Sequence, residues 1–217
     1  MIELSNVTKA YSTSAGSTPI LTGVDMHLER GDSIGILGRN GAGKSTLLRI
    51  IGGAELPDSG TVERTMSVSW PLAFAGGFQS SLTGADNVRF ICRVYGVDPQ
   101  ACIGYVEDFT ELGIYLHEPV RTYSSGMRAR LAFASSMVVE FDCYLIDEIV
   151  AVGDSRFQAK CREELFVKRA DRARIIVSHD AGYIRDHCNR AAVLLGGKLV
   201  HFDSVDDAFE AYAEVMA

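Results

Sequence analysis

The sequence predicts an α/β protein with a mainly parallel sheet, an N-terminal antiparallel β subdomain and an inserted helical subdomain. Apolar runs typical of buried strands occur at residues 34–37, 143–146 and 174–177. Segments with helical spacing lie between them, and strands that alternate with helices indicate a parallel sheet covered on both faces. In such a sheet ligands bind at the carboxyl ends of the strands, so functional residues are expected there.

The N-terminal part of the chain is expected to form strands. Aliphatic and β-branched residues favour strands at 2–7 and 20–28, and the small polar residues of 12–18 indicate a surface turn between them. After a run of turn residues, shorter strands are expected at 61–63 and 66–70. These segments precede and follow the first helix of the chain.

The pattern changes in the middle of the chain. Residues 87–95, 99–112 and 126–139 have helical spacing, and Gly, Pro or Ser bounds each segment. We interpret them as a helical subdomain over about residues 83–141, inserted into one domain that spans residues 1–217.

The last third returns to the α/β pattern. A charged amphipathic helix is predicted at 154–170, before the buried strand at 174–177. Residues 191–195 and 198–202 predict a hairpin across two glycines, and a last helix is expected at about 206–216.

A phosphate-binding loop occupies the junction between the strand at 34–37 and the next helix. Residues 38–46 fit the pattern Gly-x-x-x-x-Gly-Lys-[Ser/Thr], and residues 47–51 open a helix. Glycines let the backbone N–H groups wrap around phosphate oxygens, and the helix adds free donors and the positive end of its dipole. A glycine-rich turn without function is the alternative, but pattern, strand and helix all agree. The predicted ATP-binding residues are Gly38, Asn40, Gly41, Gly43, Lys44, Ser45 and Thr46.

The side chains of this loop and of two later strand ends predict an Mg²⁺-dependent ATPase. Lys44 is expected to reach the β- and γ-phosphates, and Ser45 to coordinate Mg²⁺ together with Asp147, the residue after the apolar run 143–146. Glu148 is a candidate to orient or deprotonate the attacking water, and His179 to sense the γ-phosphate. The alternatives are a solvated acidic pair and a histidine that only makes structural hydrogen bonds.

Composition limits the function further. The formal net charge of −7 argues against broad nucleic-acid binding, which needs a basic surface. No apolar run is long enough to cross a bilayer and the N-terminus lacks signal-peptide features, so we expect a cytosolic location. Five scattered cysteines without a Cys-x-x-Cys pair indicate reduced, small apolar residues: Cys92, Cys102, Cys143, Cys161 and Cys188.

With these motifs the chain resembles the ATP-binding cassette ATPases of ABC transporters over nearly its whole length. Residues 123–127, Tyr-Ser-Ser-Gly-Met, stand where the family has its Leu-Ser-Gly-Gly-Gln signature, at the start of a helix. The resemblance implies that Ser124 and Gly126 bind the γ-phosphate held by a second copy, in a head-to-tail dimer that sandwiches ATP. It also implies that Gln79 contacts Mg²⁺ and water, that Tyr11 stacks on adenine, and that Asp154 and His179 are the D-loop and switch residues.

Departures from the family pattern indicate a subfamily. Ser125 replaces a glycine, Met127 replaces a glutamine, Ile149 replaces a proline, and the loop at 80–84 is short. In these features, and in the stretch 147–154, the chain resembles the ATPase subunits of Gram-negative capsular-polysaccharide exporters. O-antigen and teichoic-acid exporter ATPases share part of the pattern. The resemblance implies a membrane-spanning permease as partner and a peripheral place on the cytoplasmic face of the bacterial inner membrane.

Two other classes of function compete with the export ATPase. A soluble cassette ATPase of DNA repair or translation is disfavoured because the chain is short, acidic and without a coiled-coil insertion. A binding module that uses ATP only as a dimerisation switch is ranked last because Glu148 is present.

Overall fold

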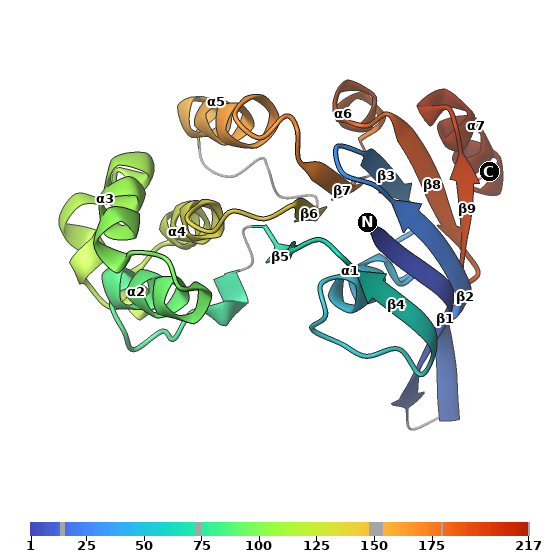
Figure 1. Ribbon diagram of the computed structural model, residues 1–217, viewed down its shortest axis with the longest axis horizontal. Coiled ribbons are helices and arrows are strands. Elements are labelled where there is room, and N and C mark those ends of the chain that lie inside the picture. Colours follow the sequence, from blue (N-terminus) through green and yellow to red (C-terminus); the bar gives the residue numbers. More distant parts are fainter. Residues whose placement is uncertain (14–15, 73–74, 148–153, 179, 217) are drawn as a thin grey trace. The chain divides into compact units, whose positions relative to one another are not determined.

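A computed structural model describes residues 1–13, 16–72, 75–147, 154–178 and 180–216. Their contacts divide them into two compact units. The first unit holds the strands β1 to β9, the helix after the phosphate-binding loop and the last two helices (Figure 1). The second unit holds the remaining four helical segments and short 3₁₀ turns.

A six-stranded sheet forms the centre of the first unit. Its strand order is β5-β6-β7-β3-β8-β9, in which the first five strands run parallel and β9 pairs antiparallel with β8. This confirms the predicted parallel sheet and the hairpin near its end. The strands are β3 (Ser33–Leu37), β5 (Val68–Pro71), β6 (Cys143–Asp147), β7 (Ala173–Val177), β8 (Arg190–Leu195) and β9 (Lys198–Phe202).

A second, antiparallel sheet confirms the predicted N-terminal β subdomain. It has the order β2-β1-β4 and consists of β1 (Ile2–Thr13), β2 (Gly16–Leu28) and β4 (Ser59–Arg64). The turn predicted at 12–18 is shorter than expected, because Tyr11 pairs with Thr18 and Thr13 with Gly16. Cross-strand pairing overrides the polar composition of this segment, so Tyr11 lies on a paired strand and not in a turn.

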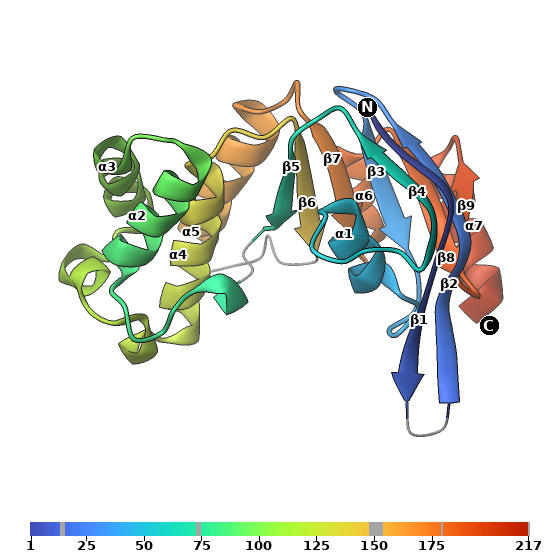
Figure 2. The same cartoon turned by 60° about the horizontal axis from the view of Figure 1, so that its bottom comes forward.

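Helices cover both faces of the six-stranded sheet (Figure 2). On one face α1 (Lys44–Ile51) packs Leu47, Leu48, Ile50 and Ile51 into a core that includes Ile34 and Ile36 of β3. On the other face Leu37 packs with residues of α6 (Ala181–His187) and α7 (Val205–Met216). β3 is therefore buried on both sides, and its carboxyl end has a fixed position.

The helix α6 was not predicted from the sequence. It has seven residues and no apolar repeat, and Asp180 caps its N-terminus by accepting a hydrogen bond from the Tyr183 N–H at 3.2 Å. Gly35 makes its packing possible, since a Cβ there would lie 2.4 Å from Cγ2 of Ile184. The absence of a side chain at Gly35 allows α6 to pack on β3, and no pattern in the sequence of α6 indicates this contact.

The second unit consists mainly of helices, as expected from a fold class with an inserted helical subdomain, and its helices include α5, which lies beyond the predicted bounds of about 83–141. Thr83, Asp98 and Ser124 cap three of them, each side chain accepting a hydrogen bond from a backbone N–H of the first turn. The single α-helix predicted at 154–170 is wrong in its second half, where the chain forms a π-helical turn, η4 (Glu163–Val167). The helices are α2 (Gly84–Tyr95), α3 (Pro99–Thr110), α4 (Ser125–Met137) and α5 (Ser155–Arg162).

A buried arginine joins the π-helical turn to the end of α4. Arg169 is 8% exposed and donates to Glu164 Oε2 at 2.8 Å, to Glu140 Oε1 at 2.7 Å and to the Met137 carbonyl at 3.1 Å. Glu164 is also buried. Lys168 also pairs with Glu164, so this carboxylate is held by two cations, and the buried guanidinium of Arg169 depends on Glu164 and Glu140 for its charge partners.

The cysteine thiols lie mostly in the protein interior. All five cysteines are free, and four of them are buried. Burial raises the pKa of Cys143 and of Cys161 to about 12, so these thiols stay protonated near neutral pH. Within the described ranges, no helix has both the length and the apolar character needed to cross a membrane.

The substitution Arg169→Met is expected to destabilise the protein by about 1–3 kcal/mol, because Oε2 of Glu164 and the Met137 carbonyl lose a buried donor, while Lys168 still pairs with Oε1 of Glu164. The shift of the urea unfolding midpoint measures this loss. Arg162→Met, at an exposed position of α5, is the matched control and should change stability by less than about 0.5 kcal/mol. Equal stability of the two variants would contradict the structural role of Arg169.

Candidate functional site

A pocket of about 270 Å³ lies where the phosphate-binding loop enters α1. The loop follows β3, and the first helical residue of α1 is Lys44. Among the described residues no side chain caps the N-terminus of α1, so its first backbone N–H groups can donate to an anion. The pocket brings together six predicted residues from the loop and one from β6, with Ile20 of β2 beside them: Asn40, Gly41, Gly43, Lys44, Ser45, Thr46 and Asp147.

Two glycines of the loop are required by its backbone. Gly41 and Gly43 have φ angles of 81° and 104°, in the left-handed region that favours glycine. A Cβ on Gly43 would also lie 2.6 Å from Cγ2 of Ile20. The spacing of the motif therefore reflects the conformation that turns the chain from β3 into α1. Gly38, at the end of β3, is buried, and a Cβ there would lie 3.1 Å from the Leu194 carbonyl oxygen.

The ammonium group of Lys44 lies over the loop. It donates to the Gly38 carbonyl at 2.5 Å and to the Arg39 carbonyl at 3.0 Å. These contacts hold a positive charge in the lining of the pocket, at the first residue of α1. A polyphosphate with several negative charges suits this combination of a cation and backbone donors.

Asp147 is the last residue of β6, and it lines the same pocket as Ser45. β7 separates β6 from β3 in the sheet, and all three strands point the same way, so their carboxyl ends meet at one edge. A carboxylate and a hydroxyl are hard oxygen ligands of the kind that Mg²⁺ prefers. The residues present therefore fit a magnesium ion next to a bound phosphate.

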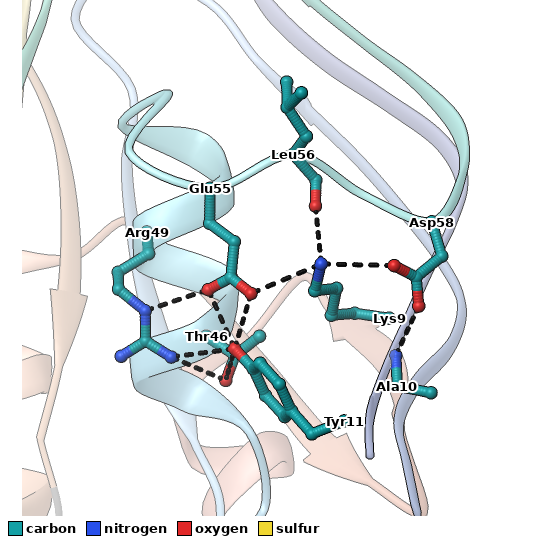
Figure 3. Close-up of polar contacts among 8 residues, drawn as sticks. All are labelled: Lys9, Ala10, Tyr11, Thr46, Arg49, Glu55, Leu56 and Asp58. Atoms are coloured by element: carbon teal, nitrogen blue, oxygen red, sulfur yellow. Dashed lines mark hydrogen bonds and ion pairs between the residues drawn. The ribbon is translucent and has the colours of Figure 1, made fainter. Parts of the chain in front are cut away.

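Tyr11 lies near this pocket without lining it. Its hydroxyl oxygen is 3.4 Å from Oγ1 of Thr46, a pocket residue, and it donates to both carboxylate oxygens of Glu55 (Figure 3). Glu55 follows α1, and Arg49 of α1 donates to it at 3.0 Å. Glu55 and Arg49 could not be predicted from the sequence, because they belong to no motif and meet Tyr11 only through the pairing of distant segments.

The signature residues occupy the start of α4 in the second unit. Ser124 is the N-cap of α4, and its Oγ accepts a hydrogen bond from the Met127 N–H at 3.2 Å. Ser124, Ser125 and Gly126 are exposed, whereas Tyr123 is buried and donates its hydroxyl to the Tyr115 carbonyl. An exposed helix N-terminus with a small residue and a serine presents donors to solvent.

Gln79 and Asp154 also belong to the second unit. The Asn87 side chain makes hydrogen bonds to both backbone groups of Gln79. It accepts from the Gln79 N–H at 2.8 Å and donates to the Gln79 carbonyl at 3.2 Å. The Gln79 side chain is exposed. Asp154 caps α5 by accepting from the Phe157 N–H at 2.9 Å and binds Arg130 at 2.9 Å. Both contacts hold the pKa of Asp154 below its usual value, the Phe157 N–H most strongly.

Two predicted catalytic residues, Glu148 and His179, lie outside the described residues. The described residues next to them lie at the carboxyl ends of two strands of the six-stranded sheet. Asp147 is the last residue of β6, and Ser178 follows β7, which lies between β6 and β3. Their roles stay predictions.

Comparisons with known proteins give consistent matches. The family model for the ABC transporter matches residues 21–151. The "ATP-binding protein BexA" of Haemophilus influenzae is 57% identical over 214 residues, 99% of each chain. The "Capsule polysaccharide export ATP-binding protein CtrD" of Neisseria meningitidis is 56% identical over 212 residues, 98% of each chain.

A solved structure shares the fold at lower identity. The ATP-binding cassette MJ0796, described as a dimer in a post-hydrolysis state bound to ADP and Pi, is 22% identical with a TM-score of 0.78. The match covers 92% of this chain and 96% of that chain. It confirms the predicted fold class, an α/β core with antiparallel strands and helices.

The substitution Gly43→Ala is expected to destabilise the protein by about 1–3 kcal/mol, because the new Cβ would need a left-handed backbone and would collide with Ile20. Thermal unfolding measures the loss. Gly104→Ala in α3 is the control: its Cβ would meet nothing within 4 Å, and alanine favours a helix. A Gly43→Ala protein as stable as the Gly104→Ala protein would contradict this account of the loop.

Proposed function

The chain belongs to the ABC transporter family, and we propose that it is the ATP-hydrolysing subunit of an exporter that moves capsular polysaccharide across the inner membrane. Two relatives support this proposal over almost their full length, and the name of one of them states capsule polysaccharide export. Their identities of 57% and 56% favour capsule export over the related O-antigen and teichoic-acid exporters.

The pocket at the start of α1 is the observation that carries the ATPase part of the proposal. Lys44, Ser45 and Asp147 lie around one cavity together with the backbone of the glycine loop. In the proposal, Lys44 and the free N–H groups of α1 bind the β- and γ-phosphates. Mg²⁺, held by Ser45 and Asp147 with Gln79, would neutralise charge that develops on the phosphates during hydrolysis.

Three residues are proposed to act on the γ-phosphate and the attacking water. Glu148 follows Asp147 at the end of β6, which suits a group that orients the water and accepts its proton. His179 comes two residues after β7 and would donate a hydrogen bond to a γ-phosphate oxygen. Gln79 would contact the water from the second unit.

A second copy of the chain is proposed to complete each site. Ser124 and Gly126 are exposed at the start of α4, where the serine hydroxyl and helix N–H groups can bind a phosphate held by another copy. The MJ0796 cassette, which shares the fold, is described as a dimer, and this supports the arrangement. The two copies would enclose two ATP molecules head to tail, with Asp154 beside the nucleotides.

The path across the membrane is assigned to a separate permease subunit, with this chain at the cytoplasmic face. ATP-driven closure of the dimer would be transmitted to that permease. No contact between this chain and the polysaccharide is required, because the polysaccharide passes through the permease.

Two variants are expected to separate ATP binding from ATP hydrolysis. Lys44→Ala should weaken ATP binding by about tenfold or more, because the phosphates lose a fixed cation. Glu148→Gln should bind ATP normally yet lower phosphate release by about 100-fold or more, and cells that carry it should lose surface capsule. Nucleotide titration and phosphate release measure the two effects, and equal loss of ATP affinity in both variants would refute the division of roles.

The head-to-tail arrangement is expected to allow complementation between two inactive variants. Ser124→Arg should leave ATP binding unchanged and abolish hydrolysis, because its phosphate lies in the other subunit's site. A dimer of Ser124→Arg with Lys44→Ala still contains one site with both halves intact. Phosphate release should therefore reappear when the two are mixed. If mixed dimers form, shown with two affinity tags, and release stays at background, the arrangement is wrong.

A further inference from the structure

The hydroxyl of Tyr11 is fully occupied by neighbouring side chains (Figure 3). It donates to the carboxylate of Glu55, at 2.7 Å and 2.8 Å to the two oxygens, and accepts from Nη2 of Arg49 at 3.0 Å. A phenol has one hydrogen to donate. Tyr11 therefore offers a ligand the surface of its ring and no free hydrogen for a bond.

Glu55 is fixed by several contacts of its own. Its backbone N–H donates to the Arg49 carbonyl at 3.2 Å, and its carboxylate binds Nε of Arg49 at 3.0 Å and Nζ of Lys9 at 3.3 Å. The side chain is 19% exposed. The Tyr11 hydroxyl most strongly, and then Arg49 and Lys9, hold the pKa of Glu55 below its usual value. The acceptor for Tyr11 is thus a charged group in a defined place.

The same cluster contacts the phosphate-binding helix. Nη2 of Arg49 donates to Oγ1 of Thr46 at 3.2 Å, and Thr46 lines the pocket and is 6% exposed. The ring of Tyr11 and the first turn of α1 therefore share one set of hydrogen bonds. A shift of Glu55 would move the ring relative to the pocket.

The strand that carries Tyr11 is bound to the same loop. Asp58 accepts from the Ala10 N–H at 2.7 Å and from Nζ of Lys9 at 3.1 Å, and Lys9 also donates to the Leu56 carbonyl at 2.9 Å. Nζ of Lys9 lies 5.8 Å from the centre of the Tyr11 ring. The backbone and the side chain at residue 11 are therefore both restrained by the segment that follows α1.

We propose that Glu55, supported by Arg49, is a positioning residue that holds the ring of Tyr11 against the base of the bound nucleotide. This inference rests on the proposed function of the pocket as a nucleotide site. Glu55 is not among the described residues that line the pocket, so it would act through Tyr11 and not on the nucleotide itself. Because the Tyr11 hydroxyl is occupied, the ring contributes stacking, which every base accepts, so Glu55 should affect ATP and GTP alike.

The test compares ATP with inorganic tripolyphosphate, which has the phosphates and no base. Glu55→Ala should weaken ATP binding by about three- to tenfold through lost stacking and leave tripolyphosphate binding unchanged. Phosphate release should show a raised KM with the same kcat. Glu55→Gln keeps an oxygen acceptor for the Tyr11 hydroxyl and should restore most of the ATP affinity.

Controls separate this role from a general loss of structure. Glu63→Ala, at an exposed glutamate of β4, should change neither affinity. Glu55→Ala added to Tyr11→Ala should cause no further loss of ATP affinity. Equal weakening of both ligands by Glu55→Ala, or unchanged ATP binding, would overturn the inference. Failure of the unmodified protein to bind either ligand would instead refute the proposed nucleotide site.

Discussion

The backbone N–H groups at the start of α1, which no side chain in the described part of the chain caps, are the feature on which the candidate site depends. The position of these N–H groups is fixed because β3 is buried between β7 and β8 and because α1 packs its apolar face on that sheet. The turn between them requires left-handed residues, which glycine supplies at positions 41 and 43. Lys44 and Asp147 then add opposite charges to the lining of the same pocket.

Local patterns were sufficient to predict most of the fold and the core of the site. The glycine loop, the apolar strands and the helical spacing are short-range signals; they predicted the parallel sheet and a helical subdomain, and they singled out residues that line one pocket. Features set by distant contacts could not be predicted. The extension of the N-terminal hairpin to Tyr11, the short helix α6 beside Gly35, and the meeting of Glu55 with Tyr11 all depend on segments that are far apart in sequence.

Residues assigned by family resemblance have structural roles that suit their proposed functions. Ser124 caps α4 through an accepting oxygen, which leaves its hydrogen for a phosphate. Asp154 caps α5 and binds Arg130 of the signature helix, so the start of α5 is tied to the helix that begins at Ser125. A capping role alone would explain either residue. The proposed dimer gives both of them a second role, as groups next to nucleotide.

Steady-state phosphate release by the purified protein with ATP and Mg²⁺ tests the central claim most directly. The account predicts continued turnover that requires Mg²⁺, because the pocket combines phosphate donors, Lys44 and an acidic strand end. Tight ATP binding without any phosphate release, at concentrations where the protein is dimeric, would contradict it. That result would make the chain a nucleotide-dependent dimerisation module.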